Sequence, residues 1–295
     1  MSERGALRER LGDLARSRRS SEGVPRAEAP PRKVAANRSE SATHGTVARS
    51  SAESGTAVGV EAFLPGGEWR GERGAVFVHE RLRSDIERRR AHWGTVTRSG
   101  DFPELDDLAA SGLERALFLD LETGGLSSSP VFLAGTMRWN GEDFVLRQIF
   151  ARHYGEEAAL LEALAELMLE FDTLVTFNGK SYDLPFLTQR AAIHGVRLRP
   201  PAFHLDLLHL SRRRWKQDLR DCRLQTLERH VCRRSRSGDV PGEEVPGLYH
   251  DFVRRGDPYR LIPVFHHNLL DVITMAELLR ALGAPAARAR GAIPR

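Results

Sequence analysis

Residues 117–126, LFLDLETGGL, place two carboxylates at the end of an apolar run that is typical of a buried strand. Side chains two positions apart on a strand point to the same face, so Asp120 and Glu122 are expected to project together. Such close carboxylates repel each other and force one pKa up unless a cation neutralises them. The stretch therefore predicts a cation at the end of this strand, and the alternative is an exposed strand end with two solvated acids.

The residues around this strand predict an α/β fold. Asn140-Gly141 lies between two strand patterns and is a strong hairpin signal. A helix that joins two strands implies a right-handed parallel crossover. We therefore predict a mixed sheet of about five strands flanked by helices. The expected order is a strand (115–120), a hairpin (131–150), a helix (156–171), a strand (172–178), a helix (184–195), a strand (202–208) and then helices to about residue 283.

The chain of 295 residues is long enough for one large domain or two small ones. Its first 55 residues are rich in Arg, Ser, Ala, Glu and Pro and have too few apolar groups to offset the entropy of ordering. We predict a disordered basic tail over 1–55, an extension packed on the core over 56–112, the α/β domain over 113–284, and a flexible tail over 285–295.

Composition favours a cytoplasmic protein with an anionic partner and no membrane contact. The net charge is +4, and no apolar run approaches the ~18 residues that span a bilayer. The first residues carry charges where a signal peptide needs an apolar region. Cys222 and Cys232 are too few and too far apart for a zinc cluster.

Two further carboxylates are expected near the first pair. Asp183 follows a strand parallel to the first, so its loop should open at the same sheet edge, although a helix N-cap would also explain it. Asp271 has apolar neighbours in a late helix, which favours a buried position that needs a partner, although a solvated helix face is the alternative. Four carboxylates suit Mg²⁺ or Mn²⁺, and two such ions about 3.5–4 Å apart are the usual arrangement for phosphodiester cleavage.

Taken in order, these motifs resemble the DEDD-type 3′–5′ exonuclease superfamily, which has a ribonuclease-H-like fold. They most resemble the bacterial YprB-type ribonuclease-H-like group, through FLDLETGGL, TFNGKSYDLPFL, HLDLLHLSRRRWK, GDVPGEEVPGLYHDFV and HHNLLD, over roughly residues 60–280. The resemblance implies that Asp120, Glu122, Asp183 and Asp271 are catalytic ligands of two Mg²⁺ or Mn²⁺ ions. A nearby His or Tyr would handle the attacking water.

Two histidines compete for that role. His266 fits the HxxxxD pattern of one subclass, and His267 stands where the other subclass, YxxxD, has Tyr. On a continuous helix residues i and i+4 share a face, which favours His267 beside Asp271. If residue 266 lies in a loop before the helix, helical spacing does not favour one histidine over the other. The chain also departs from many relatives at Gly124, where they have Thr.

Candidate nucleic-acid contacts lie in two stretches. The loop before Asp183 supplies Asn178, Lys180 and Ser181, although turn chemistry explains them equally well. Residues 211–237 hold ten Lys and Arg against three acids. From this stretch we single out four cations and one aromatic residue that could stack on a base, namely Arg212, Arg213, Arg214, Lys216 and Trp215. The alternative is a solvated arginine-rich helix face with Trp215 in the core.

These observations predict a metal-dependent 3′–5′ exonuclease that acts on a single-stranded end of DNA or RNA by a two-ion mechanism. A non-catalytic ribonuclease-H-like module for nucleic-acid binding or assembly is the alternative. An endonuclease with the same metal pair is a third interpretation.

Overall fold

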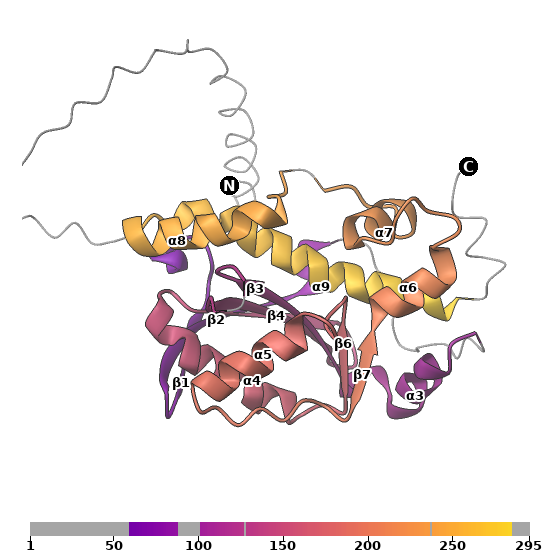
Figure 1. Ribbon diagram of the computed structural model, residues 1–295, viewed down its shortest axis with the longest axis horizontal. Coiled ribbons are helices and arrows are strands. Elements are labelled where there is room, and N and C mark those ends of the chain that lie inside the picture. The colour runs from indigo at the N-terminus through magenta and orange to yellow at the C-terminus, as the bar shows by residue number, and fades with distance from the viewer. Residues whose placement is uncertain (1–58, 88–100, 127, 237, 285–295) are drawn as a thin grey trace, which may run out of the picture. The chain divides into compact units, whose positions relative to one another are not determined.

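A seven-stranded mixed sheet forms the centre of the protein (Figure 1). The strand order is β1-β2-β5-β4-β3-β6-β7, and only the β3–β6 and β6–β7 pairs are parallel. The strands are β1 (Gly67–Gly71), β2 (Gly74–Leu82), β3 (Ala116–Thr123), β4 (Val131–Trp139), β5 (Phe144–Phe150), β6 (Thr173–Thr176) and β7 (Phe203–Asp206). The α/β class and the mixed sheet predicted from the sequence are confirmed.

The computed structural model describes residues 59–87, 101–126, 128–236 and 238–284. These residues belong to one compact unit, Val58–Arg295. The tails expected over 1–55 and 285–295 lie outside the described residues.

The sheet has two strands more than the five expected. β1 and β2 come from residues 67–82, in the segment interpreted as an extension, and β2 pairs with β5 from Phe77–Phe150 to Leu82–Val145. The sequence of β1, GEWRG, is short and largely polar, so it carries no strand pattern of its own. It is held by pairing with β2 rather than by intrinsic preference.

Helices cover both faces of the sheet (Figure 1). Helices α4 (Glu157–Met168) and α5 (Asp183–Ile193) pack on one face, while the long helix α9 (Ile262–Gly283) lies along the other with α6 (Leu207–Trp215) and α7 (Leu224–His230). The other helices of the described residues are α2 (Arg83–Ile86), α3 (Pro103–Ser111) and α8 (Val245–Arg255), with 3₁₀ turns at Val60–Ala62, Leu113–Arg115, Tyr154–Glu156, Gly242–Glu244 and Pro258–Leu261. No helix among the described residues is both long and apolar enough to cross a membrane.

Strand β3 alternates its side chains between the two helical layers. Leu117 and Leu119 pack with α4, whereas Phe118 packs with α9. The period of two along a strand carries the α9-facing side on to Asp120 and Glu122. Both carboxylates therefore face the helix that carries Asp271.

Candidate functional site

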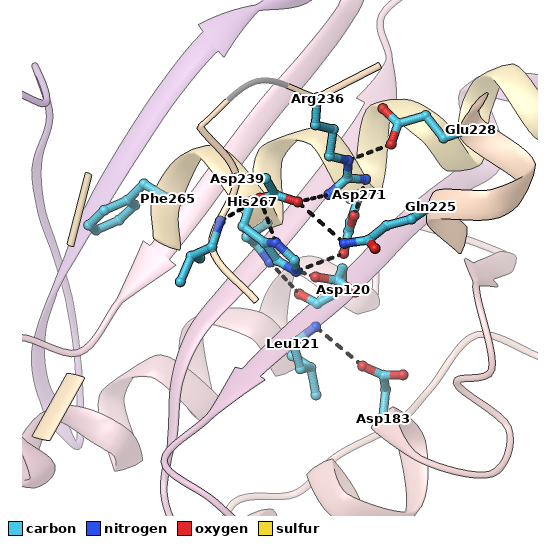
Figure 2. Close-up of polar contacts among 12 residues, drawn as sticks. Asp120, Leu121, Asp183, Gln225, Glu228, Arg236, Asp239, Phe265, His267 and Asp271 are labelled. Atoms are coloured by element: carbon cyan, nitrogen blue, oxygen red, sulfur yellow. Dashed lines mark hydrogen bonds and ion pairs between the residues drawn. The ribbon is translucent and has the colours of Figure 1, made fainter. Parts of the chain in front are cut away.

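The carboxyl end of β3 extends beyond its parallel partner. Pairing with β6 runs only from Ala116–Thr173 to Phe118–Val175, so beyond that point the edge of β3 that faces β6 has no strand partner, while its other edge stays paired with β4. There the side chain of Asp183 takes the place of a strand, and its Oδ1 accepts from the amide of Leu121 at 3.2 Å. Asp183 is thus tied to the segment between Asp120 and Glu122, as the parallel topology predicted (Figure 2).

Asp183 is the first residue of α5 and does not cap it. The N-cap position is Tyr182, which makes no side-chain capping bond. The loop before it is held instead by Asp206, a buried residue at the end of β7, which accepts from the amides of Asn178 at 2.8 Å and Lys180 at 3.0 Å. Asn178 has a positive φ of 66°, a conformation that asparagine tolerates better than most residues. Asp206 therefore sets the path by which the chain reaches Asp183.

Helix α9 contributes a buried amide as well as the expected acid. Asn268, which has no exposed surface, donates from Nδ2 to the Oδ2 of Asp120 at 2.9 Å and to its backbone oxygen at 3.2 Å. Gln148 of β5 donates to Asn268 Oδ1 at 3.0 Å and to the carbonyl of Phe265 at 2.8 Å. These bonds fix the orientation of Asp120 against α9.

His267 lies beside Asp271 on one face of α9. Its Nε2 is 3.4 Å from Asp271 Oδ2, and its Nδ1 is 2.8 Å from Asp239 Oδ1. His266 is also inside the helix, because α9 begins at Ile262, and it has no hydrogen bond or ion pair with any described residue. The i, i+4 geometry therefore brings His267, and not His266, to the carboxylates.

Arg236 supplies a cation that we did not single out from the sequence. Its guanidinium is nearly buried, contacts Glu228 and Asp271, and lies 3.3 Å from Asp239 Oδ2 (Figure 2). It comes from the segment between α7 and α8. One basic side chain thus joins that segment to α7 and α9.

Burial and mutual repulsion raise the pKa values of all four carboxylates. For Asp120, burial comes first, followed by the charges of Asp271, Glu122 and Asp183. Burial is also the largest cause for Glu122, Asp183 and Asp271, and neighbouring carboxylates raise their pKa values further. At Asp271 the cations Arg236 and His267 offset part of the rise. A cluster of this kind holds more negative charge than its surroundings neutralise, which is the electrostatic setting of a cation site.

His267 neutralises part of the negative charge of this cluster. Burial alone would lower its pKa, but the hydrogen bond with Asp239 and the charges of Asp271 and Glu122 raise the pKa to about 9. In contrast, burial lowers the pKa of His266. At neutral pH His267 is therefore a cation that lies against Asp271.

The donor set fits hard divalent ions in its chemistry. All four acids offer carboxylate oxygens, which Mg²⁺ and Mn²⁺ prefer. Within the described ranges, no group of three or more His, Cys, Asp or Glu residues is arranged so that it could hold a metal ion. Three of the acids instead accept hydrogen bonds from the protein, because the amide of Leu121 contacts Asp183 and the side chains of Asn268 and Arg236 contact Asp120 and Asp271. The four acids lie together, but their oxygens are not arranged to coordinate a metal ion.

The structure corrects part of the expected nucleic-acid surface. Trp215 has 2% of its surface exposed and packs in the core, so it cannot stack on a base. Arg213 pairs with Glu104, and Arg214 pairs with Asp101 at 2.7 Å. Of the expected set, the exposed side chains are Lys180, Ser181, Arg212, Arg213 and Lys216, whereas Asn178 and Arg214 are half-buried.

Gly124 lies where the chain turns away from the carboxylates. Its carbonyl is 2.7 Å from His250 Nε2, and His250 Nδ1 is 2.7 Å from the hydroxyl of Tyr154. A Cβ atom at position 124 would lie 3.1 Å from the His250 ring and from Pro130. The absence of a side chain at this position allows α8 to approach the loop.

Several site residues escaped the sequence reasoning. Asn268 and Asp239 lie inside stretches that resemble the YprB-type group, but no spacing rule distinguishes them from solvated polar residues. Arg236 and Asp206 act through contacts between distant segments, and nothing in their neighbouring residues signals this. A buried environment, which only the fold reveals, is what gives them a role.

Comparison with family models agrees with this architecture. A family model described as the RNase_H superfamily matches residues 117–283. The chain is 35% identical over 179 residues to the uncharacterized protein YprB of Bacillus subtilis (strain 168), covering 58% of this chain and 43% of YprB, so it spans less than half of that relative. It is also similar to the family B DNA polymerase of the archaeon Pyrobaculum calidifontis, at 19% identity and a TM-score of 0.47, over 57% of this chain and 24% of the polymerase chain. The resemblance to the ribonuclease-H-like YprB-type group is thereby confirmed, and the chain belongs to the RNase_H superfamily.

Proposed function

We propose that this protein is a divalent-metal-dependent nuclease, and specifically a 3′–5′ exonuclease that uses two Mg²⁺ or Mn²⁺ ions. One observation carries the proposal. β3, α5 and α9 bring four carboxylates to one edge of the sheet, where burial and repulsion raise the pKa of each. Such a cluster favours cations over any neutral ligand.

In this proposal Asp120, Glu122, Asp183 and Asp271 hold the ions. The ions, when bound, would lower the pKa of a water molecule and stabilise the leaving 3′ oxygen. His267, whose Nε2 faces Asp271, is the candidate to accept the proton of the attacking water. It can do so only as the neutral imidazole, and neutralisation of the nearby Asp271 and Glu122 by bound cations would lower its raised pKa toward that form.

The remaining contacts orient these groups. Asp239 holds Nδ1 of His267, and Asn268 holds Oδ2 of Asp120. The proposed substrate is a single-stranded end of DNA or RNA, with the exposed cations Lys180, Arg212 and Lys216 as candidate phosphate contacts. A cytoplasmic place of action is part of the proposal, and both cysteines being free thiols supports it.

The test is digestion of 5′-labelled single-stranded DNA and RNA by the full chain in Mg²⁺, Mn²⁺ or EDTA. We expect a ladder that shortens from the 3′ end, requires the divalent ion, and disappears in Asp120→Asn. Asp107→Asn, at an exposed position of α3, is the matched control and should cleave as the wild type does. Cleavage of a circular single strand, which has no end, would show that the protein is an endonuclease rather than an exonuclease.

A second candidate is a ribonuclease-H-like module that binds nucleic acid without cleaving it. The contacts of Arg236 with Asp271 and of Asn268 with Asp120 favour it, because side-chain donors of the protein already engage two of the four acids. Intact substrate under every metal condition, together with retained binding in a gel-shift assay, would establish this candidate instead.

A further inference from the structure

Arg236 is enclosed by acidic side chains from three parts of the chain. Only 5% of its side chain is exposed, and it contacts Glu228 of α7, Asp239 of its own segment and Asp271 of α9 (Figure 2). The guanidinium faces three carboxylates with three different nitrogens. It is therefore a permanent cation at the border of the carboxylate cluster.

Both carboxylate oxygens of Asp271 contact basic side chains. Arg236 Nη2 donates to Oδ1, and His267 Nε2 lies 3.4 Å from Oδ2. A divalent ion needs a lone pair of a carboxylate oxygen, and it repels a guanidinium at the same oxygen. Arg236 and a divalent ion thus compete for Asp271.

We propose that Arg236 occupies the place of a divalent ion at Asp271 in the metal-free protein and releases Asp271 when that ion binds. The inference rests on the proposed function, because it assumes that Asp271 is a metal ligand. It assigns to Arg236 a positioning role: this residue sets the affinity of the site for metal.

The other two acids make this release possible. A buried guanidinium that lost its only partner would be strongly destabilised. Arg236 keeps Glu228, whose side chain is 2% exposed, and Asp239 when Asp271 is withdrawn. The cation therefore stays paired in both states.

Arg234 offers a matched control in the same segment. It too is largely buried, pairing with Glu87 at 2.6 Å, with Glu277 at 3.0 Å and, at a longer 3.9 Å, with Glu228, which also contacts Arg236. Among the ion pairs of the described residues, none joins Arg234 to Asp120, Glu122, Asp183 or Asp271. Removing it takes away the same charge without freeing Asp271.

The experiment measures Mn²⁺ binding to the full chain by electron paramagnetic resonance, without nucleic acid. The proteins are the wild type, Arg236→Gln, Arg236→Lys, Arg234→Gln and Asp120→Asn. Competition predicts that Arg236→Gln binds Mn²⁺ about tenfold more tightly than the wild type, the size of a typical coupling between two ligands. Arg236→Lys keeps the charge but loses the guanidinium that contacts several acids at once. Its affinity for Mn²⁺ should therefore lie between those of the wild type and Arg236→Gln. Arg234→Gln should bind as the wild type does.

Any of the following results would overturn the inference. Unchanged or weaker Mn²⁺ binding by Arg236→Gln would mean that Arg236 does not compete for Asp271. An equal gain in Mn²⁺ affinity in Arg234→Gln would show that the effect comes from net charge and not from competition for Asp271. If Arg236→Gln does not fold by circular dichroism, Arg236→Lys decides, and an affinity equal to that of the wild type overturns the proposal.

The same data separate this inference from the proposed function. If the wild type binds Mn²⁺, Asp120→Asn loses that binding and Arg236→Gln shows no gain, only the role of Arg236 fails. If neither the wild type nor any variant binds Mn²⁺, the metal-dependent function fails and the inference fails with it.

Discussion

The amide of Asn268 fills the space that a side chain at Gly135 would occupy. A Cβ atom on Gly135 would lie 2.1 Å from Asn268 Oδ1 and 2.6 Å from its Cγ. Gly135 is the β4 residue that pairs with Asp120 in the sheet. The missing side chain on β4 thus lets α9 bring a hydrogen-bond donor to Asp120.

Gly135→Ala should lower the free energy of unfolding by about 1–3 kcal/mol, the usual range for overpacking a core. The matched control is Gly67→Ala, also at a strand position, where an added Cβ meets nothing within 4 Å. Urea unfolding of both variants checks the prediction. Equal stability of Gly135→Ala and the wild type would show that Asn268 has room to move.

Asn268→Asp would place a fifth acid against Asp120 and remove the amide that donates to it. We expect the melting temperature of this variant to fall in EDTA and to recover with Mn²⁺, because the added charge repels its neighbours until a cation binds. Asn268→Ala lacks the charge, and its melting temperature should respond to Mn²⁺ less strongly. Differential scanning fluorimetry with and without Mn²⁺ provides the comparison.

Asp206→Ala should loosen the loop that leads to Asp183. Three amides, those of Asn178, Lys180 and Leu208, would lose their acceptor. An unsatisfied buried donor costs about 1–3 kcal/mol, and the cost is smaller for the two part-buried amides of the loop. Faster hydrogen exchange over residues 177–183 is the expected result. Asp206→Asn keeps one acceptor oxygen and should show a smaller change, and equal protection in all three proteins would contradict the assignment.

Glu157 makes the fold sensitive to acid. Burial would raise its pKa, but hydrogen bonds from Arg190, the amide of Val131 and His194 outweigh burial and lower it. The unfolded chain therefore takes up this proton at a higher pH than the folded chain does. The stabilisation is complete above the unfolded value of about 4.3 and is lost as the pH falls through the folded value.

We expect the free energy of unfolding of the wild type to decline more steeply below about pH 5 than that of Glu157→Gln. Glu166→Gln, on an exposed position of the same helix, is the control and should follow the wild type. Urea midpoints from pH 7 to pH 3 test this. Parallel curves for the wild type and Glu157→Gln would refute the role of Glu157.

Lys180→Ala should weaken binding to single-stranded DNA or RNA and make it less dependent on salt. Each phosphate contact adds about 0.7 to the slope of log affinity against log salt for single strands. Arg138→Ala is the control, because Arg138 pairs with Leu117 near the start of β3, away from the carboxylates. Fluorescence anisotropy between low and moderate salt measures both slopes, and equal slopes in the wild type and Lys180→Ala would exclude a phosphate contact.

The order of elements and the shared sheet edge were predictable because they follow from local rules. Strand alternation places Asp120 and Glu122 on one face, and the parallel crossover brings the loop of Asp183 to the same end. Helical spacing brings His267 to Asp271. These rules need only the residues within one element or the path between two.

Ion pairing and edge strands were not predictable in this way. Arg213 and Arg214 were expected to be free for phosphate, but Glu104 and Asp101, more than a hundred positions away, pair with them. Strand β1 exists because β2 offers it a partner, and its own residues favour no strand. In both cases the outcome depends on a partner that the local sequence does not contain.

The position of α9 along the chain bears on when the site can exist during synthesis. Asp271, His267 and Asn268 all lie on this helix, the last element that the structure describes. A nascent chain whose α9 is still inside the ribosome therefore has three of the four acids but neither the fourth nor the histidine beside it. The carboxylate cluster is complete only after almost the whole described chain has emerged, so a partly translated chain cannot assemble it amid the messenger and ribosomal RNA around it.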